Sequence, residues 1–251
     1  MIAHITWYTH PHQIIFFLSP GAQFIGQELQ AGFDTTKEGF EYHIGVNHIG
    51  HAYLTKLLLN DLKMTAAKKK TSGARIVFIS SMAEAGAPDV GFIFKDWNPV
   101  DGTMPKNYED GIAYGQSKLA NYMYAKELSL QLNETGVSVY SCHPGIIKSD
   151  LSRYMEKELN KQTEEQGKVV KFLNDILMMA FESTIMDVQT GAMTQLHLST
   201  AEKESLVNGG FYYPIGRLVK PSHPLSEDDA LRKKLWIETE KAIAMGSTYS
   251  A

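Results

Sequence analysis

Apolar residues return at two different spacings along the chain from about residue 40. Where they recur every three or four residues, the pattern predicts amphipathic helices. The segments with this spacing are 44–62, 112–132, 185–198 and 227–244. Short runs of β-branched and aromatic residues are typical of buried strands. The segments of this kind are 75–81, 137–142 and 210–213. The alternation predicts an α/β fold, a doubly wound parallel sheet with helices on both faces.

The length and composition favour a single domain that binds a small molecule. The 251 residues, 43% of them hydrophobic, suffice for one sizeable core, and no repeat or linker interrupts the pattern. The formal net charge is −4, and the Lys and Arg residues are scattered. Because nucleic-acid-binding proteins gather basic residues into a patch or stripe, that class of partner is excluded.

Nothing in the pattern predicts a membrane-spanning helix. The apolar run near the start, 14–18, is far shorter than the roughly 20 residues that span a bilayer, and no basic segment precedes it. The single cysteine, Cys142, lies in an apolar run and has no partner for an internal disulfide. A reducing compartment suits such a chain, and we expect a cytoplasmic location.

Polar side chains with a chemical use follow the predicted strands. In Tyr114-Gly-Gln-Ser-Lys118 a phenol and an ammonium lie four residues apart, and therefore one turn apart on the same face of a helix. A nearby cation stabilises a phenolate and lowers the pKa of the phenol from about 10. Ser80-Ser81 and His143-Pro144-Gly145 end two strands, at the edge where open parallel sheets bind ligands.

Taken together, these motifs resemble the short-chain dehydrogenase/reductase family in type, order and spacing, from about residue 33 to 213. The stretches that carry the likeness are Gly39–Glu41, Val46–His51, Ser80–Ser81, Tyr114–Asn121, Cys142–Gly145 and the long segment between Ser81 and Tyr114 that contains Gly91–Trp97. Within the family they resemble the branch of the retinol dehydrogenases and the WW-domain oxidoreductase.

The resemblance implies roles for four catalytic residues. Tyr114 would be the general acid in carbonyl reduction and the base in alcohol oxidation, and Ser81 would hydrogen-bond the reacting oxygen. Lys118 would lower the pKa of Tyr114 and hold the nicotinamide ribose, while Asn47 would hold a water that relays the proton outward. The implied activity is an NAD(P)-dependent interconversion of an alcohol and a carbonyl.

The resemblance also implies a Rossmann-like fold and a cofactor site. Tyr114 and Lys118 would contact the cofactor, and four residues after the strand at 137–142 would shape the nicotinamide pocket. These four are Pro144, Gly145, Ile147 and Ser149. NADP is slightly favoured over NAD. The helix at 112–132 often forms a dimer face in this family, so a homodimer is a possible assembly.

The sequence departs from the family in its first part. Members begin with a strand and a Thr-Gly-x-x-x-Gly-x-Gly turn, whose glycines let the backbone approach the cofactor's pyrophosphate. The nearest segment, 14–26, has only Gly21 and Gly26, with the bulky Phe24 where a glycine is needed. We therefore expect an unmatched segment at 1–32, a core at 33–214 and a C-terminal tail and helix at 215–251. The fold would be incomplete in its N-terminal half and would bind cofactor poorly.

Two further features have alternative interpretations. His48, His51 and His143 lack carboxylate or thiolate partners at ligand spacing, so packing is favoured over metal binding and no metal site is expected. The apolar stretch 172–181 is either core or a cover over an apolar substrate such as a retinoid, a steroid or a fatty aldehyde. The alternative to an enzyme is a catalytically impaired relative that acts through protein association.

Overall fold

The protein has a six-stranded mixed sheet at its centre. The computed structural model describes residues 8–10, 13–18, 32–68, 73–147 and 185–247. The strand order is β1-β2-β3-β4-β7-β8, with parallel pairing from β2 to β7 and an antiparallel strand at each edge. The six strands are β1 (Tyr8–His10), β2 (Gln13–Leu18), β3 (Ala74–Ile79), β4 (Val137–Cys142), β7 (Phe211–Tyr213) and β8 (Arg217–Val219). A separate parallel pair joins β5 (Ile146–Ile147) to β6 (Ile185–Met186).

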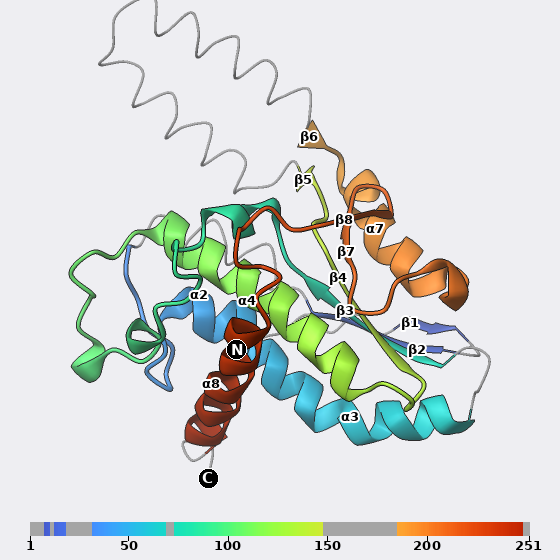
Figure 1. Ribbon diagram of the computed structural model, residues 1–251, viewed down its shortest axis with the longest axis horizontal. Coiled ribbons are helices and arrows are strands. Elements are labelled where there is room, and N and C mark those ends of the chain that lie inside the picture. The colour runs from blue at the N-terminus through green and yellow to red at the C-terminus, as the bar shows by residue number, and fades with distance from the viewer. Residues whose placement is uncertain (1–7, 11–12, 19–31, 69–72, 148–184, 248–251) are drawn as a thin grey trace, which may run out of the picture.

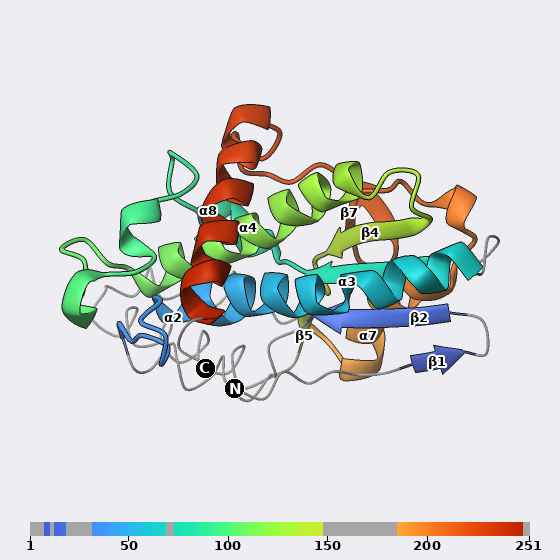
Figure 2. The same ribbon diagram turned by 90° about the horizontal axis from the view of Figure 1, so that it is seen from below.

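Helices cover both faces of this sheet, as predicted. Helices α3, α4 and α8 lie on one face and α7 lies on the other (Figures 1 and 2). The α-helices are α2 (Tyr42–Ile44), α3 (Gly50–Lys68), α4 (Asp110–Gln131), α7 (Val188–Thr200) and α8 (Asp229–Ser247). A π-helical turn, η1 (Gly45–Ile49), joins α2 to α3, and the 3₁₀ helices are η2 (Met82–Gly86), η3 (Phe94–Asp96), η4 (Val100–Gly102) and η5 (Lys203–Ser205). The fold is the doubly wound α/β class that the sequence predicts.

The alternation of side chains along the central strands produces a core on each face. Ile76 and Phe78 of β3 belong to the larger core beneath α3, α4 and α8. Val77 and Ile79 point the other way, into the smaller core that includes Leu198 of α7. Because both faces are buried, these strands read in the sequence as continuous apolar runs.

Strands β3 and β4 end at the same edge of the sheet. Their register runs from Ala74 opposite Val137 to Ile79 opposite Cys142, and the Ser80 N–H donates to the Cys142 carbonyl at 2.8 Å. The residues that follow the two strands therefore meet at one edge, which is where the sequence places Ser81 and His143.

The apolar run near the start of the chain forms a strand next to this pair. The apolar run at 14–18 forms most of β2, which pairs in parallel with β3 itself. The glycines that follow the run, Gly21 and Gly26, and Phe24 lie outside the described residues.

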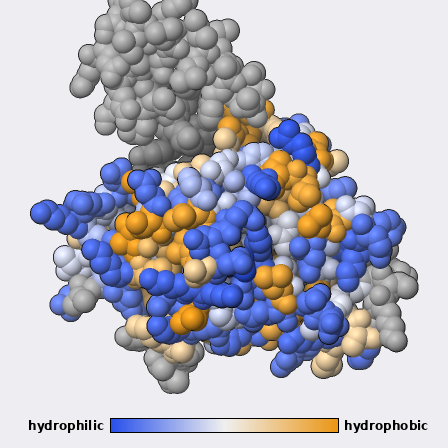
Figure 3. Space-filling model, viewed as in Figure 1, coloured by the Kyte–Doolittle hydropathy of each residue, from blue (hydrophilic) through white to orange (hydrophobic). Residues whose placement is uncertain are grey.

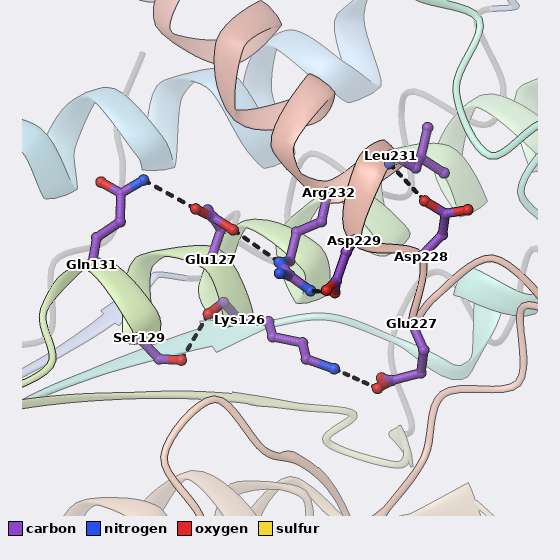
Figure 4. Close-up of polar contacts among 9 residues, drawn as sticks. All are labelled: Lys126, Glu127, Ser129, Gln131, Glu227, Asp228, Asp229, Leu231 and Arg232. Carbon is purple, nitrogen blue, oxygen red and sulfur yellow. Dashed lines mark hydrogen bonds and ion pairs between the residues drawn. The ribbon is translucent and has the colours of Figure 1, made fainter.

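Helix α8 packs across α4 through charged contacts, which Figure 4 shows, and through an aromatic contact. Arg232 Nε donates to Glu127 Oε2 at 2.8 Å, and Lys126 pairs with Glu227. Further along α8 on the same interface, the rings of Tyr124 and Trp236 stack, with their centroids 4.8 Å apart and their planes at 10° to each other. Helix α4 thus lies between the sheet and α8.

Capping side chains explain two of the element ends that differ from the predicted ones. The helix predicted at 185–198 begins only at Val188, because Asp187 caps it by accepting from the Thr190 N–H at 2.7 Å and Ile185–Met186 forms β6. The strand predicted at 75–81 ends at Ile79, because Ser81 caps the turn η2.

Apolar side chains form separate groups on a mostly polar surface in the view of Figure 3. Among the helices that the structure describes, none combines the length and the apolar character needed to cross a bilayer.

Candidate active site

The end of β3 and the first turns of α4 bring Ser81, Tyr114 and Lys118 together. The Lys118 Nζ lies 5.2 Å from the centroid of the Tyr114 ring, as expected for residues one turn apart. The Ser81 side chain hydrogen-bonds the Tyr114 phenol. Ser81 Oγ also accepts from the Ala83 N–H at 3.1 Å, which leaves its own proton free to be donated. The predicted trio therefore shares one location.

A glycine between the two α4 residues permits this close approach. A Cβ at Gly115 would lie 2.6 Å from the Ala83 carbonyl oxygen and 2.9 Å from the Ala87 nitrogen, both backbone atoms of the segment that carries Ser81. Any larger residue would push this segment away from the helix. Gly115 is thus a residue that positions Ser81 against Tyr114, and sequence analysis did not single it out.

Two buried polar contacts fix the end of β3 to α4. Ser80 Oγ donates to the Lys118 carbonyl at 2.7 Å, and Asn121 Nδ2 donates to the Ile79 carbonyl at 3.1 Å. Both bonds join the strand to the helical turn that carries Lys118. Because buried polar groups are costly when unpaired, the contacts hold the two elements in a single register.

Asn47 reaches the same helix from the π-helical turn η1. Its Nδ2 donates to Ser117 Oγ at 3.0 Å, and the Ser117 hydroxyl donates to the Tyr114 carbonyl at 2.7 Å. Asn47 is buried, and its side chain is therefore engaged in holding α4. π-Helical turns are frequent at functional sites, and this one places Asn47 beside the predicted catalytic turn.

The pKa of the Tyr114 phenol differs from the expectation. Burial raises the pKa of Tyr114 to about 12, and the hydrogen bond from Ser81 opposes this only in part. The prediction of a net lowering is therefore wrong for the protein as described here, because the cost of burying a phenolate exceeds the stabilisation that surrounds it.

The charge of Lys118 acts on three buried histidines, and each comes from a different element. His43 belongs to α2, His51 to α3, and His143 directly follows β4. The pKa of each is lowered to about 4, first by burial and then by the charge of Lys118. The His43 ring also meets the Tyr114 ring edge-on, with centroids 5.8 Å apart.

Sequence analysis assigned His51 and His143 to packing and did not consider His43. All three have a buried Nδ1 without a hydrogen-bond partner among the described residues. The sequence offered one signal for these histidines: His43 and His51 flank Asn47, and His143 precedes Pro144. His48, in contrast, is a satisfied packing residue, as expected: its Nε2 contacts Thr239 Oγ1 at 2.8 Å and its Nδ1 contacts Asn121 Oδ1 at 3.3 Å.

The other predicted cofactor residues follow β4. Gly145 has φ +98°, and a Cβ there would lie 2.8 Å from Met186 Sδ, so glycine is required at this turn. Ile147 pairs with Met186 between β5 and β6. Ser149 lies outside the described residues, as does the apolar stretch 172–181. Within the described ranges, no group of three or more His, Cys, Asp or Glu side chains is arranged to hold a metal ion.

Known proteins are similar to this chain in sequence. A family model described as short chain dehydrogenase matches residues 102–160. Human retinol dehydrogenase 12 is 33% identical over 205 residues, which cover 81% of this chain and 54% of that protein. Human retinol dehydrogenase 13 is 32% identical over 211 residues, which cover 84% of this chain and 56% of that protein. The chain spans about half the length of these curated relatives.

A solved structure shows the same fold. The crystal structure of an uncharacterised protein from Mycobacterium paratuberculosis matches with a TM-score of 0.53 and 22% identity, covering 89% of this chain and 72% of that chain. The chain belongs to the short-chain dehydrogenase/reductase family and is similar to its retinol dehydrogenases.

Proposed function

We propose that the protein is an NAD(P)-dependent oxidoreductase that interconverts an alcohol and a carbonyl on an apolar substrate. The observation that carries this proposal is the convergence of Ser81, Tyr114 and Lys118 where β3 and β4 end. A hydrogen-bond donor, a phenol and a cation at one point can bind a carbonyl oxygen and give it a proton.

The described residues fit the reacting end of a nicotinamide nucleotide. Tyr114 and Lys118 provide a hydroxyl and an ammonium for the ribose, at the sheet edge where open α/β folds bind ligands. His143 adds a buried Nδ1 at the same edge, with no hydrogen-bond partner within the described ranges. The sequence contains no Thr-Gly-x-x-x-Gly-x-Gly turn for the phosphates, and we propose that cofactor binding is correspondingly weak.

In reduction, Tyr114 would donate its proton to the carbonyl oxygen and Ser81 would donate a hydrogen bond to the same atom. The bound nicotinamide would supply the hydride to the carbonyl carbon. A phenol with a pKa of about 12 keeps its proton at neutral pH, which suits a proton donor. In oxidation Tyr114 must first lose that proton, and the charge of Lys118 next to the ring favours the phenolate.

The apolar substrate class rests on the relatives and on the sequence. The similar human proteins are retinol dehydrogenases, and retinol is an apolar alcohol. The stretch 172–181 is rich in apolar residues. We propose an alcohol or aldehyde of the retinoid, steroid or lipid type, with NADP favoured over NAD by the family resemblance.

The test is turnover by the purified full chain with all-trans-retinal, at saturating NADPH and NADH in separate assays. Tyr114→Phe removes the proton donor and keeps the ring, so we expect a loss of at least about a hundredfold in kcat. Tyr53→Phe on α3 makes the same chemical change away from the site and should leave kcat within about twofold.

Turnover that survives Tyr114→Phe would contradict the proposed role. Binding is measured separately, by titrating each cofactor and following Trp97 and Trp236 fluorescence. No binding of either nucleotide at millimolar concentration would contradict the proposed enzyme.

A further inference from the structure

Glu84 is a buried residue in the turn η2, three residues after Ser81. Its two carboxylate oxygens accept from two consecutive backbone N–H groups in the segment between β8 and α8. The Ser222 N–H donates to Oε1 at 2.6 Å, and the His223 N–H donates to Oε2 at 3.0 Å. Because an ionised carboxylate accepts through both oxygens, this one side chain joins η2 to a segment that follows it by more than a hundred residues.

The His223 ring makes a second connection between the same two segments. Its Nδ1 accepts from the Leu225 N–H at 3.2 Å, so this nitrogen carries a lone pair and the hydrogen of the neutral ring is on Nε2. Nε2 lies 3.0 Å from the carbonyl oxygen of Pro88, two residues after η2, and donates to it. We call the bonds from segment 222–223 to Glu84 and Pro88 the Glu84–His223 latch.

Two backbone groups of η2 bind Ser81 to the turn that the latch holds. The Glu84 N–H donates to the Ser81 carbonyl at 3.2 Å, and the Ala83 N–H donates to Ser81 Oγ at 3.1 Å. A shift of Glu84 therefore acts on the main chain of Ser81 directly and on its hydroxyl through the neighbouring residue.

The backbone of the same turn packs directly on α4. A Cβ at Gly115 would lie 2.6 Å from the Ala83 carbonyl oxygen and 2.9 Å from the Gly86 carbonyl carbon. The turn η2 thus touches α4 through its backbone and segment 222–223 through the Glu84 side chain. The seat of Ser81 depends on both contacts.

The segment that binds Glu84 is itself fixed to α4 by way of α8. The Asp228 N–H donates to the Leu225 carbonyl at 3.0 Å, and the Arg232 N–H donates to the Asp228 carbonyl at 2.9 Å. Arg232 Nε then donates to Glu127 Oε2 on α4 at 2.8 Å. Because α4 also carries the phenol, the latch belongs to a closed ring of contacts that runs from η2 through α8 and α4 back to η2.

We propose that Glu84 is a positioning residue for Ser81: its bonds to segment 222–223 hold η2 against α4 and keep the Ser81 hydroxyl beside Tyr114. The effect on turnover rests on the proposed function, because the place of Ser81 matters to the rate only if its hydroxyl binds the reacting oxygen. The latch and its hold on Ser81 do not depend on turnover.

The first experiment measures amide hydrogen exchange by NMR in the ¹⁵N-labelled full chain without cofactor. Glu84→Gln keeps the shape of the side chain and replaces one oxygen by a group that cannot accept. Whichever way the amide turns, at least one of the Ser222 and His223 amide protons should exchange at least about tenfold faster. The Ala83 amide proton, which the Ser81 hydroxyl accepts, should also exchange faster.

Two controls separate a local change from a general loosening of the fold. The Thr190 N–H on α7 donates to the Asp187 carboxylate at 2.7 Å, and its exchange rate should be the same in Glu84→Gln as in the wild type. Glu204→Gln makes the same chemical change at an exposed position in η5. This variant should leave all of these exchange rates, and kcat, within about twofold of the wild type.

The second experiment measures the effect of Glu84→Gln on turnover in two backgrounds. With Ser81 present we expect kcat to fall about tenfold with little change in KM, which is less than the hundredfold that a displacement of about 1 Å can cause. In Ser81→Ala the same substitution should lower kcat by less than about twofold, because the hydroxyl that it displaces is already absent. A general loss of structure would instead lower kcat equally in both backgrounds.

His223→Ala tests the other half of the latch and replaces Glu84→Gln if that variant does not fold. It keeps the His223 backbone N–H for Glu84 and removes the ring that donates to Pro88. We expect a smaller fall in kcat, of about threefold, again only when Ser81 is present, together with faster exchange of the Ala83 amide proton.

Each outcome bears on a separate claim. Unchanged exchange of the Ser222 and His223 amides in Glu84→Gln overturns the latch, and an unchanged Ala83 amide overturns its hold on Ser81, whatever the activity. An equal loss of kcat in both backgrounds, or no loss in either, overturns the positioning role. A chain with the expected exchange rates and no turnover contradicts the proposed function and leaves the hold of Glu84 on Ser81 standing.

Discussion

Gly115→Ala tests how the fold holds Ser81 against Tyr114. The added Cβ would lie 2.6 Å from the Ala83 carbonyl oxygen and 2.9 Å from the Ala87 nitrogen. Both atoms belong to backbone around the turn η2, so no flexible side chain can yield to the methyl group. The turn must move by several tenths of an ångström, and it carries Ser81 with it because Ser81 caps it.

The expected loss of stability in Gly115→Ala follows from overpacking, and the expected loss of activity follows from misalignment of Ser81. Overpacking of a well-packed site costs roughly 1–3 kcal/mol, and we expect a decrease near the middle of that range in the free energy of unfolding. A misplacement of about 1 Å can cost about a hundredfold in rate, so a smaller displacement of Ser81 should lower kcat by about tenfold. Urea denaturation and steady-state turnover measure the two effects on the same preparation.

Gly111→Ala is the matched control. Gly111 lies one turn earlier on α4, and a Cβ there meets no atom within 4 Å. Alanine is the better helix former by up to about 1 kcal/mol, so this variant should be as stable as the wild type or more stable, with unchanged kcat. If Gly115→Ala behaved like Gly111→Ala, close contact between α4 and the Ser81 segment would not be what positions the site.

Three other predictions concern charge and pH. Burial raises the pKa of Tyr114 to about 12. The rate of alcohol oxidation should therefore rise roughly tenfold per pH unit from pH 7 to pH 9, while the rate of carbonyl reduction stays constant. An oxidation rate that reaches a plateau near pH 7 would contradict this. Four buried histidines are neutral in the folded protein and titrate near pH 6.5 when it is unfolded. Below that pH the unfolded state therefore binds more protons than the folded state. The free energy of unfolding should fall by about 1 kcal/mol per histidine between pH 7.5 and pH 5.5. These are His43, His48, His51 and His143. The raised pKa values of the buried carboxyls Glu41 and Glu84 oppose this loss, and urea midpoints that are equal at the two pH values would refute it. Arg232→Met leaves the Glu127 carboxylate without its cationic partner in the α4–α8 interface. The free energy of unfolding, measured by thermal or urea denaturation, should fall by about 3 kcal/mol. Lys241→Met, at an exposed pair on α8, should lower it by less than about 1 kcal/mol.

The sequence predicts the parts of the site that depend on short spacings. The strand predicted at 137–142 is β4 as observed, because an uninterrupted apolar run between turns has few alternatives. Tyr114 and Lys118 meet because helix geometry alone brings together residues four apart. Ser81 joins them because parallel strands deliver their carboxyl ends to one edge.

Spacings in the sequence do not predict features that depend on contacts between distant elements. The three histidines on which the charge of Lys118 acts come from α2, α3 and the end of β4, and no spacing in the sequence relates them to Lys118. The direction of the Tyr114 pKa shift depends on the balance of burial against charge, and the sequence reveals only the charge. The need for glycine at 115 appears only when η2 is seen against α4.

A double-mutant cycle tests the central claim, that Ser81 and Tyr114 act as one unit on the reacting oxygen. The measurement is kcat/KM for Ser81→Ala, Tyr114→Phe and the combined variant, each checked for folding. If the two side chains share the oxygen, the combined variant should be no slower than Tyr114→Phe alone, because the second substitution removes nothing that still functions. Losses that multiply would show that the two residues act independently, and they would contradict the account.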